Sequence, residues 1–322
     1  MRTSFSLIRR EFTGYFLGPV GYVALVLFLV GMGVLFRFTM ALLTAEGAKG
    51  IEFPMQGLFG NVGFWLIFWV IPPLLTMRLF AEERSTGTLE MLLTAPVRDG
   101  QVVLCKFLAC LALYIVMWLP TLLYLPVLLN LQIVWPGWSV ARILVACGLA
   151  APLGLTLAIF STGYWRLPGS ILTIGGIASC IVGLVMLRFF DHQSFCTMTP
   201  NIDPMPVLAT YLGLFGAGSM FLAIGLWISS LVRSQIVAAL FALAVNLVFI
   251  LGGLLILGGF YSPPADLDNP TFRVVNFVSV PLHVSQDFAR GIIDTRHLVL
   301  YASLTLAMLF LTLRSLERRR WQ

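Results

Sequence analysis

The stretch "PLLTMRLFAEERSTGTLEMLLTAPVRDGQVVLCKF", Pro73–Phe107, interrupts a chain that is otherwise apolar along nearly its whole length. The protein has 20 basic and 14 acidic residues, and eight of these 34 charges lie in this one stretch. They are Arg78, Glu82, Glu83, Arg84, Glu90, Arg98, Asp99 and Lys106. Such a concentration of charge in a charge-poor chain indicates a polar loop between two apolar segments.

The composition indicates that the surrounding solvent is a lipid bilayer. Of the 322 residues, 59% are hydrophobic and 11% are charged, whereas ordinary soluble domains carry roughly 25% charged residues. A soluble fold of this composition would have more apolar surface than its own core hides. The five cysteines show no C-x-x-C spacing, and we interpret them as packing residues.

Hydropathy predicts the membrane-spanning helices. A helix needs about 20 mainly apolar residues to cross the hydrocarbon core, and eight segments meet this criterion. We therefore predict an all-α polytopic membrane protein with about eight transmembrane helices. The segments are Val20–Leu43, Val62–Leu79, Val102–Leu129, Ile143–Phe160, Ile171–Leu187, Val207–Leu231, Ile236–Leu257 and Leu298–Leu313.

The distribution of lysine and arginine predicts the orientation. With the N-terminus inside and the sides alternating, 13 of the 20 basic residues fall on the inner side and 7 on the outer side. Cytoplasmic loops carry the excess of positive charge, so both termini are predicted to be cytoplasmic. The terminal "ERRRW" contributes most to this bias.

Residues 1–19 are predicted to form a cytoplasmic interfacial segment, and residues 20–322 a single transmembrane domain. Phe5, Ile8 and Phe12 recur at helical spacing with arginines between them, the pattern of an amphipathic helix lying on a membrane surface. The "RREF" at Arg9–Phe12 resembles the start of a twin-arginine export signal. No small-residue cleavage site follows the first apolar run, which argues against a cleaved signal.

The charged stretch supplies a cytoplasmic loop over residues 80–101. A charge at the bilayer centre costs about 2.5–3.5 kcal/mol on the insertion scale, so these residues are kept outside the membrane. Thr88 is placed to cap a short helix with Leu89, Leu92 and Leu93 on one face, and Pro96 ends it. Because a two-turn helix is unstable alone, it is expected to lie against the membrane surface or another protein. A solvated hairpin without a partner is the alternative.

Four stretches carry a resemblance to a known family. The charged stretch, "IRREFTGYFLGPVGYVALVLFLV" from Ile8, "YLGLFGAGSMFLAIGLWISSLVRSQIVAA" at Tyr211–Ala239 and "DFARGIIDTRHLVLY" before the last span resemble ABC-2 type permeases. These are the membrane subunits of ATP-binding-cassette exporters. The resemblance is closest to the gliding-motility-associated permease branch, and it covers Ile8–Val134 and Pro206–Trp321.

The resemblance implies six spans, a cytoplasmic helix that touches the ATPase, and a dimer of permeases. Residues 139–195 depart from it because they add an apolar pair without a match. An added pair preserves the sidedness of the spans that follow. For the outer connection 261–296 the resemblance favours short interfacial or re-entrant helices over a plain loop. The residues implied to couple the loop to the ATPase subunit are Glu82, Glu83, Arg84, Gly87, Thr88, Glu90 and Pro96.

The residues argue against chemistry in this chain itself. A phosphate-binding loop needs G-x-x-x-x-G-K-[ST], but Lys49 is followed by glycine and Lys106 by phenylalanine. We therefore expect no cofactor here and ATP on a partner subunit. An intramembrane enzyme needs paired histidines or carboxylates inside its spans. His192, His283 and His297 lie in or beside outer connections and are expected to face solvent, so no catalytic or metal site is predicted.

A secondary transporter or channel without an ATPase remains the alternative function. Ion-coupled carriers commonly place ionisable residues at the membrane midplane, whereas these spans offer Asn246 and hydroxyls such as Thr156 and Thr173. The sequence instead predicts a non-catalytic permease subunit of a bacterial ABC-2 exporter in the inner membrane. Its expected partners are an ABC ATP-binding subunit, a second permease copy or paralogue, and the lipid bilayer, with no nucleic acid.

Overall fold

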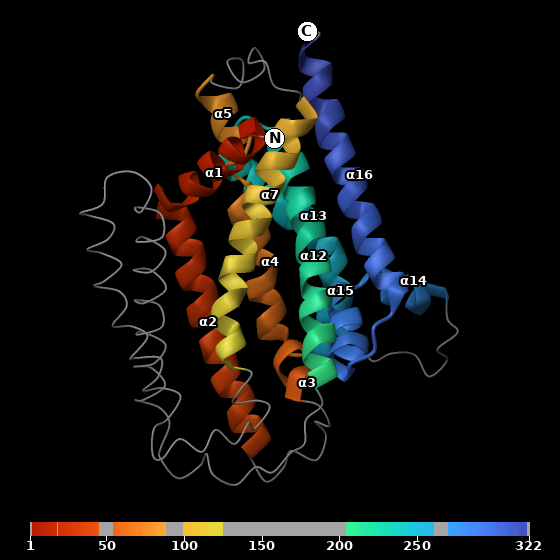
Figure 1. Cartoon of the computed structure of the whole chain (residues 1–322). Helices are drawn as coiled ribbons and strands as arrows, with labels where there is room; N and C mark the ends of the chain where they lie inside the picture. Colours follow the sequence, from red (N-terminus) through yellow and green to blue (C-terminus); the bar gives the residue numbers. More distant parts are fainter. Residues whose placement is uncertain are drawn as a thin grey trace, which may run out of the picture. The chain divides into compact units, whose positions relative to one another are not determined.

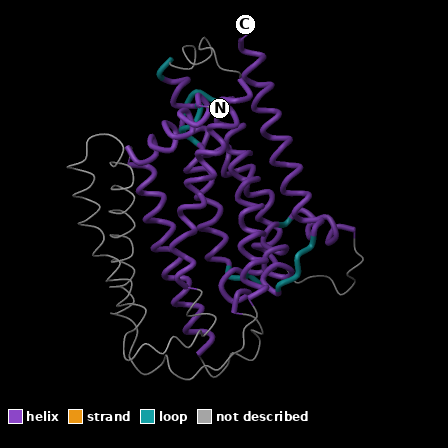
Figure 2. Tube along the Cα trace, in the orientation of Figure 1, coloured by secondary structure: helices purple, strands orange, loops and turns teal. Residues whose placement is uncertain are grey.

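The computed structural model describes residues 2–17, 19–44, 54–87, 99–124, 204–260 and 270–320 (Figures 1 and 2). About 90% of these residues are helical and no strand occurs among them, which confirms the predicted all-α class. The elements are α1 (Arg2–Leu17), α2 (Pro19–Thr44), α3 (Pro54–Phe59), α4 (Val62–Thr76), α5 (Ala81–Ser85), α7 (Asp99–Trp118), η1 (Leu119–Tyr124), α12 (Pro204–Leu231), α13 (Gln235–Leu257), α14 (Pro270–Val278), α15 (Val280–Leu282), η2 (His283–Asp287), η3 (Phe288–Arg290) and α16 (Thr295–Arg320).

Among the described residues, five helical segments are long and apolar enough to cross a membrane. They belong to α2, α7 with η1, α12, α13 and α16, and each coincides with a predicted span. The helix α4 is shorter, with 15 residues, and is followed by turns through Phe80. The predicted pair Ile143–Phe160 and Ile171–Leu187 lies outside the described residues, so the total of eight spans stays a prediction.

The chain divides into two compact units. Unit 1 comprises Met1–Phe12, Lys49–Ile115 and Met205–Gln322, and unit 2 comprises Thr13–Ala48 and Val116–Pro204. In unit 2, α2 packs with η1. The ring of Phe28 in α2 meets the Trp118 indole edge to face, with 5.0 Å between centroids. The candidate functional residues described below all belong to unit 1.

Helix α12 packs closely against its neighbours in unit 1. The Tyr114 hydroxyl of α7 donates to the carbonyl of Leu214 at 3.0 Å. A Cβ on Gly218 would overlap the Tyr114 ring, and a Cβ on Gly225 would overlap the Thr76 side chain of α4. Glycine at these two positions therefore lets α7 and α4 approach the α12 backbone, as small residues do between membrane helices.

Helix α4 packs along α13. Asn61 caps its first turn, and Pro72 and Pro73 lie inside it. Each proline removes a backbone N–H from the helix, which membrane helices tolerate where neighbours support the backbone. The Trp69 indole donates to the Leu243 carbonyl of α13 at 2.8 Å, which ties the two helices together.

Unit 1 has two distinct ends (Figure 1). The first, which we call the α5 end, carries α5, the beginning of α1 and the C-terminal end of α16. The second, the α3 end, carries α3, which contacts η2 and η3. The charged helix and both chain ends therefore share one end, as the topology prediction requires. That this end faces the cytoplasm stays a prediction.

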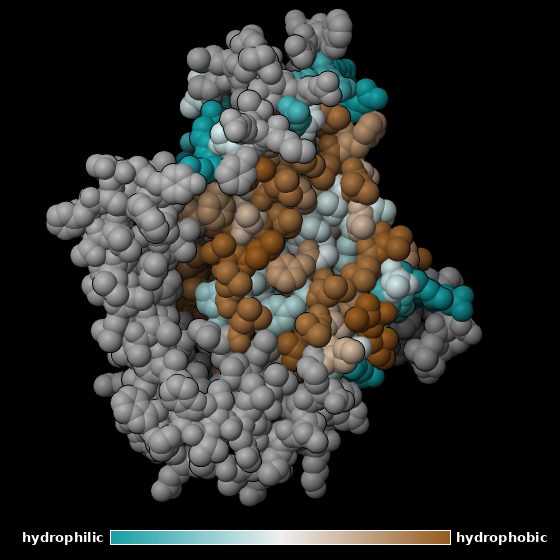
Figure 3. All heavy atoms as spheres, viewed as in Figure 1, coloured by the Kyte–Doolittle hydropathy of each residue, from teal (hydrophilic) through white to brown (hydrophobic). Residues whose placement is uncertain are grey.

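The visible face in Figure 3 is mostly apolar along the middle of α16, with hydrophilic side chains near both of its ends. Val299, Leu306 and Phe310 of this helix are 65%, 68% and 54% exposed. A long helix whose apolar side chains face outward is suited to lipid contact.

Candidate functional site

Helices α5 and α12 cap each other at the α5 end. The buried Ser229 hydroxyl of α12 accepts the backbone N–H groups of Phe80 and Ala81, each at 3.1 Å, and donates to the Met77 carbonyl at 3.3 Å. The first N–H groups of a helix have no partner within it. Ser229 therefore supplies to α5 the acceptor that an N-cap residue normally provides.

Arg84 makes the reciprocal contact. Its Nη1 atom donates to the carbonyls of Ser230 at 3.3 Å and Leu231 at 2.5 Å, the last residues of α12. A cation is stabilised there because the unpaired carbonyls give a helix C-terminus a partial negative charge. The two caps hold α5 against the end of α12 from both directions.

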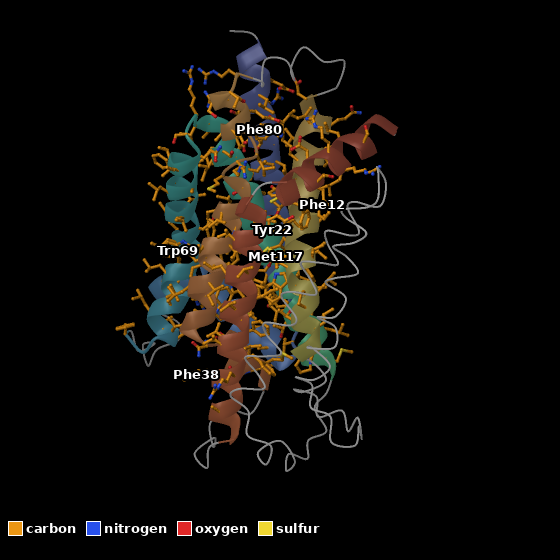
Figure 4. The ribbon with its side chains drawn as sticks, turned by 90° about the vertical axis from the view of Figure 1, so that its left-hand side faces the viewer. Phe12, Tyr22, Phe38, Trp69, Phe80 and Met117 are labelled. Carbon is orange, nitrogen blue, oxygen red and sulfur yellow. The ribbon has the colours of Figure 1, made fainter. Side chains whose placement is uncertain are left out.

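Lys106 of α7 joins three helices at the same place. Its side chain is 2% exposed, and its Nζ atom lies 2.7 Å from Glu83 Oε1 of α5 and 3.1 Å from Glu11 Oε2 of α1. The ammonium group also lies over the Phe80 ring, 5.3 Å from its centroid. In Figure 4, Phe80 lies near the α5 end and Trp69 farther from it. A buried lysine is tolerated only when it is paired, and two carboxylates pair this one.

The two glutamates of α5 differ in their environment. Glu82 receives Nε of Arg78 at 2.7 Å and Nη2 at 3.0 Å, and this hydrogen bonding lowers the pKa of its carboxyl group. Burial raises the pKa of Glu83, and the neighbouring Lys106 opposes that increase only in part. Glu82 therefore holds its charge at the surface, whereas Glu83 serves as an internal partner of Lys106.

Residues of a charged loop outside the membrane would be expected to face water, but only one of these two glutamates does so to a large extent. The Glu82 side chain is 40% exposed, but that of Glu83 is only 19% exposed. Arg84 contacts α12, and Gly87 is exposed with a φ of 74° just after α5. Such a positive φ favours glycine. Thr88, Glu90 and Pro96, and the short helix predicted to follow Thr88, lie outside the described residues.

Sequence reasoning missed three members of this cluster, Ser229, Lys106 and Glu11. Lys106 gave the one usable signal, since a lysine in an apolar span requires a partner. Nothing in the sequence said which of the 14 acidic residues supplies it. Ser229 gave no signal because serines pack between membrane helices for many reasons.

The α3 end corrects a second expectation. His283 and His297 were expected to face solvent, but they are 1% and 9% exposed, and their rings stack with 3.7 Å between centroids. His192 lies outside the described residues. For the connection 261–296 we expected short interfacial or re-entrant helices. The helices α14, α15, η2 and η3 confirm short helices over residues 270–290, and their place at the membrane stays a prediction.

The fold and these two ends define a multi-pass, all-helical membrane protein with a compact charged cluster at one end of its helices. Over residues 26–321 the sequence matches the ABC-2 family transporter proteins, and the chain belongs to that family. This confirms the family resemblance and identifies a membrane permease of the ABC type. The matched range includes residues 139–195, which the four stretches above left out. No curated protein and no solved structure matches the chain significantly.

Proposed function

We propose that this chain is the membrane-spanning permease subunit of a bacterial ABC-2 type exporter in the inner membrane. Two permeases, identical or paralogous, form the pathway, and a separate ATP-binding subunit drives it. The chain itself carries out no catalysis and holds no cofactor. Its membership of the ABC-2 family supports the permease role, and the branch associated with gliding motility stays a prediction.

The observation that carries the proposal is the way α5 is fixed to the membrane helices. It is the short polar helix that follows α4, and it is tied to α12 through Ser229 and Arg84 and to α7 through Lys106. A solvated hairpin without a partner needs none of these contacts. A helix that transmits force needs all of them, because a displacement of α5 then reaches both α12 and α7.

The mechanism follows from these contacts. The ATP-binding subunit docks on the exposed face of α5 and the residues after it, and nucleotide-driven movement displaces α5. The caps shared with α12 and the Lys106 ion pairs carry the displacement into α12 and α7. A change in the packing of these helices then alters access to the pathway, as rigid elements with two arrangements do in other coupled proteins.

Site-specific crosslinking tests the docking surface. Ser85, which is exposed on α5, is replaced by a photo-crosslinking amino acid in the full chain. The protein is co-expressed with the ATP-binding subunit that copurifies with it in mild detergent. Light should join the two polypeptides at Ser85. The same amino acid at Gln286, exposed at the α3 end, is the matched control and should give no product.

The outcomes separate the competing functions. The same amino acid can also be placed at Thr86. If the ATP-binding subunit copurifies but neither position gives a crosslink, the docking surface does not lie on α5. If no ATP-binding polypeptide copurifies and the purified chain dissipates an ion gradient in vesicles, the protein is the alternative secondary transporter or channel.

Charge reversal of Glu82 provides a second measurement. Glu82→Lys should weaken copurification of the ATP-binding subunit, since mispaired charge at an interface costs several kcal/mol. Glu317→Lys is the control, because Glu317 also pairs with an arginine and its side chain is 38% exposed against 40% for Glu82. Equal loss of binding in both variants would indicate a general charge effect instead of contact at α5.

A further inference from the structure

Two stacked histidines connect the outer connection of unit 1 to the start of α16. His283 lies in η2, and its ring stacks on that of His297 in α16 with 3.7 Å between centroids and 20° between planes. Tyr301, one turn further along α16, contacts His283 as well. The segment η2 is a short π-helix, an irregular form that is frequent at functional sites. The proposed transport function uses none of these side chains.

The two ring nitrogens of His283 both have hydrogen-bond partners, and these partners suit the neutral ring. Its Nε2 atom lies 2.7 Å from the Asn276 carbonyl oxygen, which only accepts, so Nε2 carries the proton. Its Nδ1 atom lies 3.0 Å from the Tyr301 hydroxyl. In the neutral ring with its proton on Nε2, the Tyr301 hydroxyl donates to Nδ1.

His297 opposes a positive charge on His283. The Nε2 atom of His297 lies 3.0 Å from Asp287 Oδ2 and 3.9 Å from Asp294 Oδ2. Burial of the His283 ring, with the electrostatic influence of the neighbouring His297 added, lowers the pKa of His283 from 6.5 to about 4.

No other described element packed around His283 brings a formal charge to it. Helices α3 and α13 contain no acidic or basic residue, and α12 contributes only the tyrosine Tyr211. Arg273 of α14, Arg290 of η3 and Arg296 of α16 are exposed. The two carboxylates beside His297 are thus the charged groups closest to the stacked pair.

We propose that His283, His297 and Tyr301 form a proton-binding latch that clamps η2 and the residues around it onto α16 and releases them when the adjoining solution becomes acidic. The closed latch requires neutral His283. Once η2 leaves α16, the ring reaches water and takes up a proton at its ordinary affinity. The latch is independent of any partner subunit.

The direction of the pH effect follows from the lowered pKa. The closed state is fully favoured above pH 6.5 and loses stability as the pH falls from 6.5 towards 4. With pKa values of 6.5 for the open state and about 4 for the closed state, linkage makes the opening equilibrium about thirtyfold larger at pH 5 than at pH 7.5.

Hydrogen exchange of the full chain in lipid nanodiscs tests the latch. After correction for the intrinsic pH dependence of exchange, protection of residues 279–291 should fall by about thirtyfold between pH 7.5 and pH 5. In His283→Gln, which keeps a donor and an acceptor but takes up no proton, protection should not change with pH. Residues 81–86 of the α5 end serve as the internal control and should not lose protection.

A second variant keeps the test valid if His283→Gln fails to fold. Tyr301→Phe removes the hydrogen bond that the neutral ring accepts, so the loss of protection should move to a higher pH. A parent protein whose protection does not change between the two pH values would overturn the latch. The same loss of protection in His283→Gln as in the parent would overturn it too, because other groups would then bind the proton.

Discussion

The two ends of unit 1 bury polar side chains in opposite ways. At the α5 end a formal charge, Lys106, is buried and compensated by the two carboxylates of Glu83 and Glu11. At the α3 end a titratable ring, His283, is buried in its neutral form and satisfied by neutral hydrogen bonds. Desolvation of a charge is costly in both places. One end offsets that cost with opposite charge, and the other avoids it by excluding the proton.

This difference determines how each end responds to change. An ion-pair cluster holds its geometry over a wide pH range but fails when one partner is removed. A histidine that is buried in its neutral form is sensitive to pH near the ordinary pKa of histidine. A rigid α5 end suits force transmission, and a pH-sensitive α3 end suits a response to the adjoining solution.

The largest effect is expected from Lys106→Met. Removing one partner of a buried ion pair typically costs 3–5 kcal/mol, roughly, because the remaining charge is left uncompensated. Here Glu11 and Glu83 would be left facing each other. The thermal unfolding midpoint of the detergent-solubilised protein should fall sharply.

Arg314→Met is the matched control for this variant. Arg314 pairs with Glu317 at 2.9 Å, but its side chain is 63% exposed, and exposed pairs contribute about 0–1 kcal/mol. Equal midpoints for the two variants would show that the Lys106 cluster is as solvated as a surface pair.

Ser229→Ala should have the next largest effect. Two backbone N–H groups lose their acceptor in one step, and an unsatisfied buried donor costs about 1–3 kcal/mol. We expect a loss near 2–3 kcal/mol, roughly, and faster proteolysis of the α5 segment. Ser303→Ala, at an exposed serine bonded to the Leu300 carbonyl of its own helix, should leave both unchanged. Unchanged proteolysis of α5 in Ser229→Ala would mean that α5 is held without the cap.

Close packing should be similar at the two ends even though charge is not. A Cβ on Gly225 would overlap Thr76 at the α5 end, and one on Gly213 would lie 2.7 Å from the Phe288 ring at the α3 end. Overpacking typically costs about 1–3 kcal/mol, so alanine at either position should lower the unfolding midpoint by a similar amount. Gly100→Ala, whose Cβ would meet only Leu313 at 3.9 Å, should be neutral or slightly stabilising. A large loss from only one of the two buried variants would contradict equal packing.

The smallest effect is expected from mild acid at the α5 end. The pKa of Glu82 is lowered, so its contribution to stability is present above 4.5 and is lost only as the pH falls through the lowered value. The pKa of Glu83 is raised, so its protonation favours the folded state as the pH falls. Exchange of residues 81–86 should therefore not accelerate between pH 7.5 and pH 5. If hydrogen exchange accelerated as much at residues 81–86 as at residues 279–291, the two ends would not differ in their response to pH.

Hydropathy alone predicted the five described helices that are long enough to cross a membrane, because the signal for a span lies within its own sequence. The predicted segment Ile236–Leu257 differs from α13 by one residue, and the predicted Val207–Leu231 ends where α12 ends. The bilayer requires about 20 apolar residues per crossing, so a long apolar run has few alternatives to a helix. The four quoted stretches were likewise sufficient to indicate the family that the match over residues 26–321 confirms.

Only the tertiary structure decided which polar residues act together. Ser229 lies 149 positions from Phe80, and Lys106 lies 95 positions from Glu11, so no local periodicity links them. His283 and His297 were misjudged for the same reason, since their burial depends on how η2 folds back onto α16. Hydropathy measures how strongly the side chains of each segment favour leaving water. It does not specify which partner satisfies a polar group once water is gone, because that depends on how helices far apart in sequence meet.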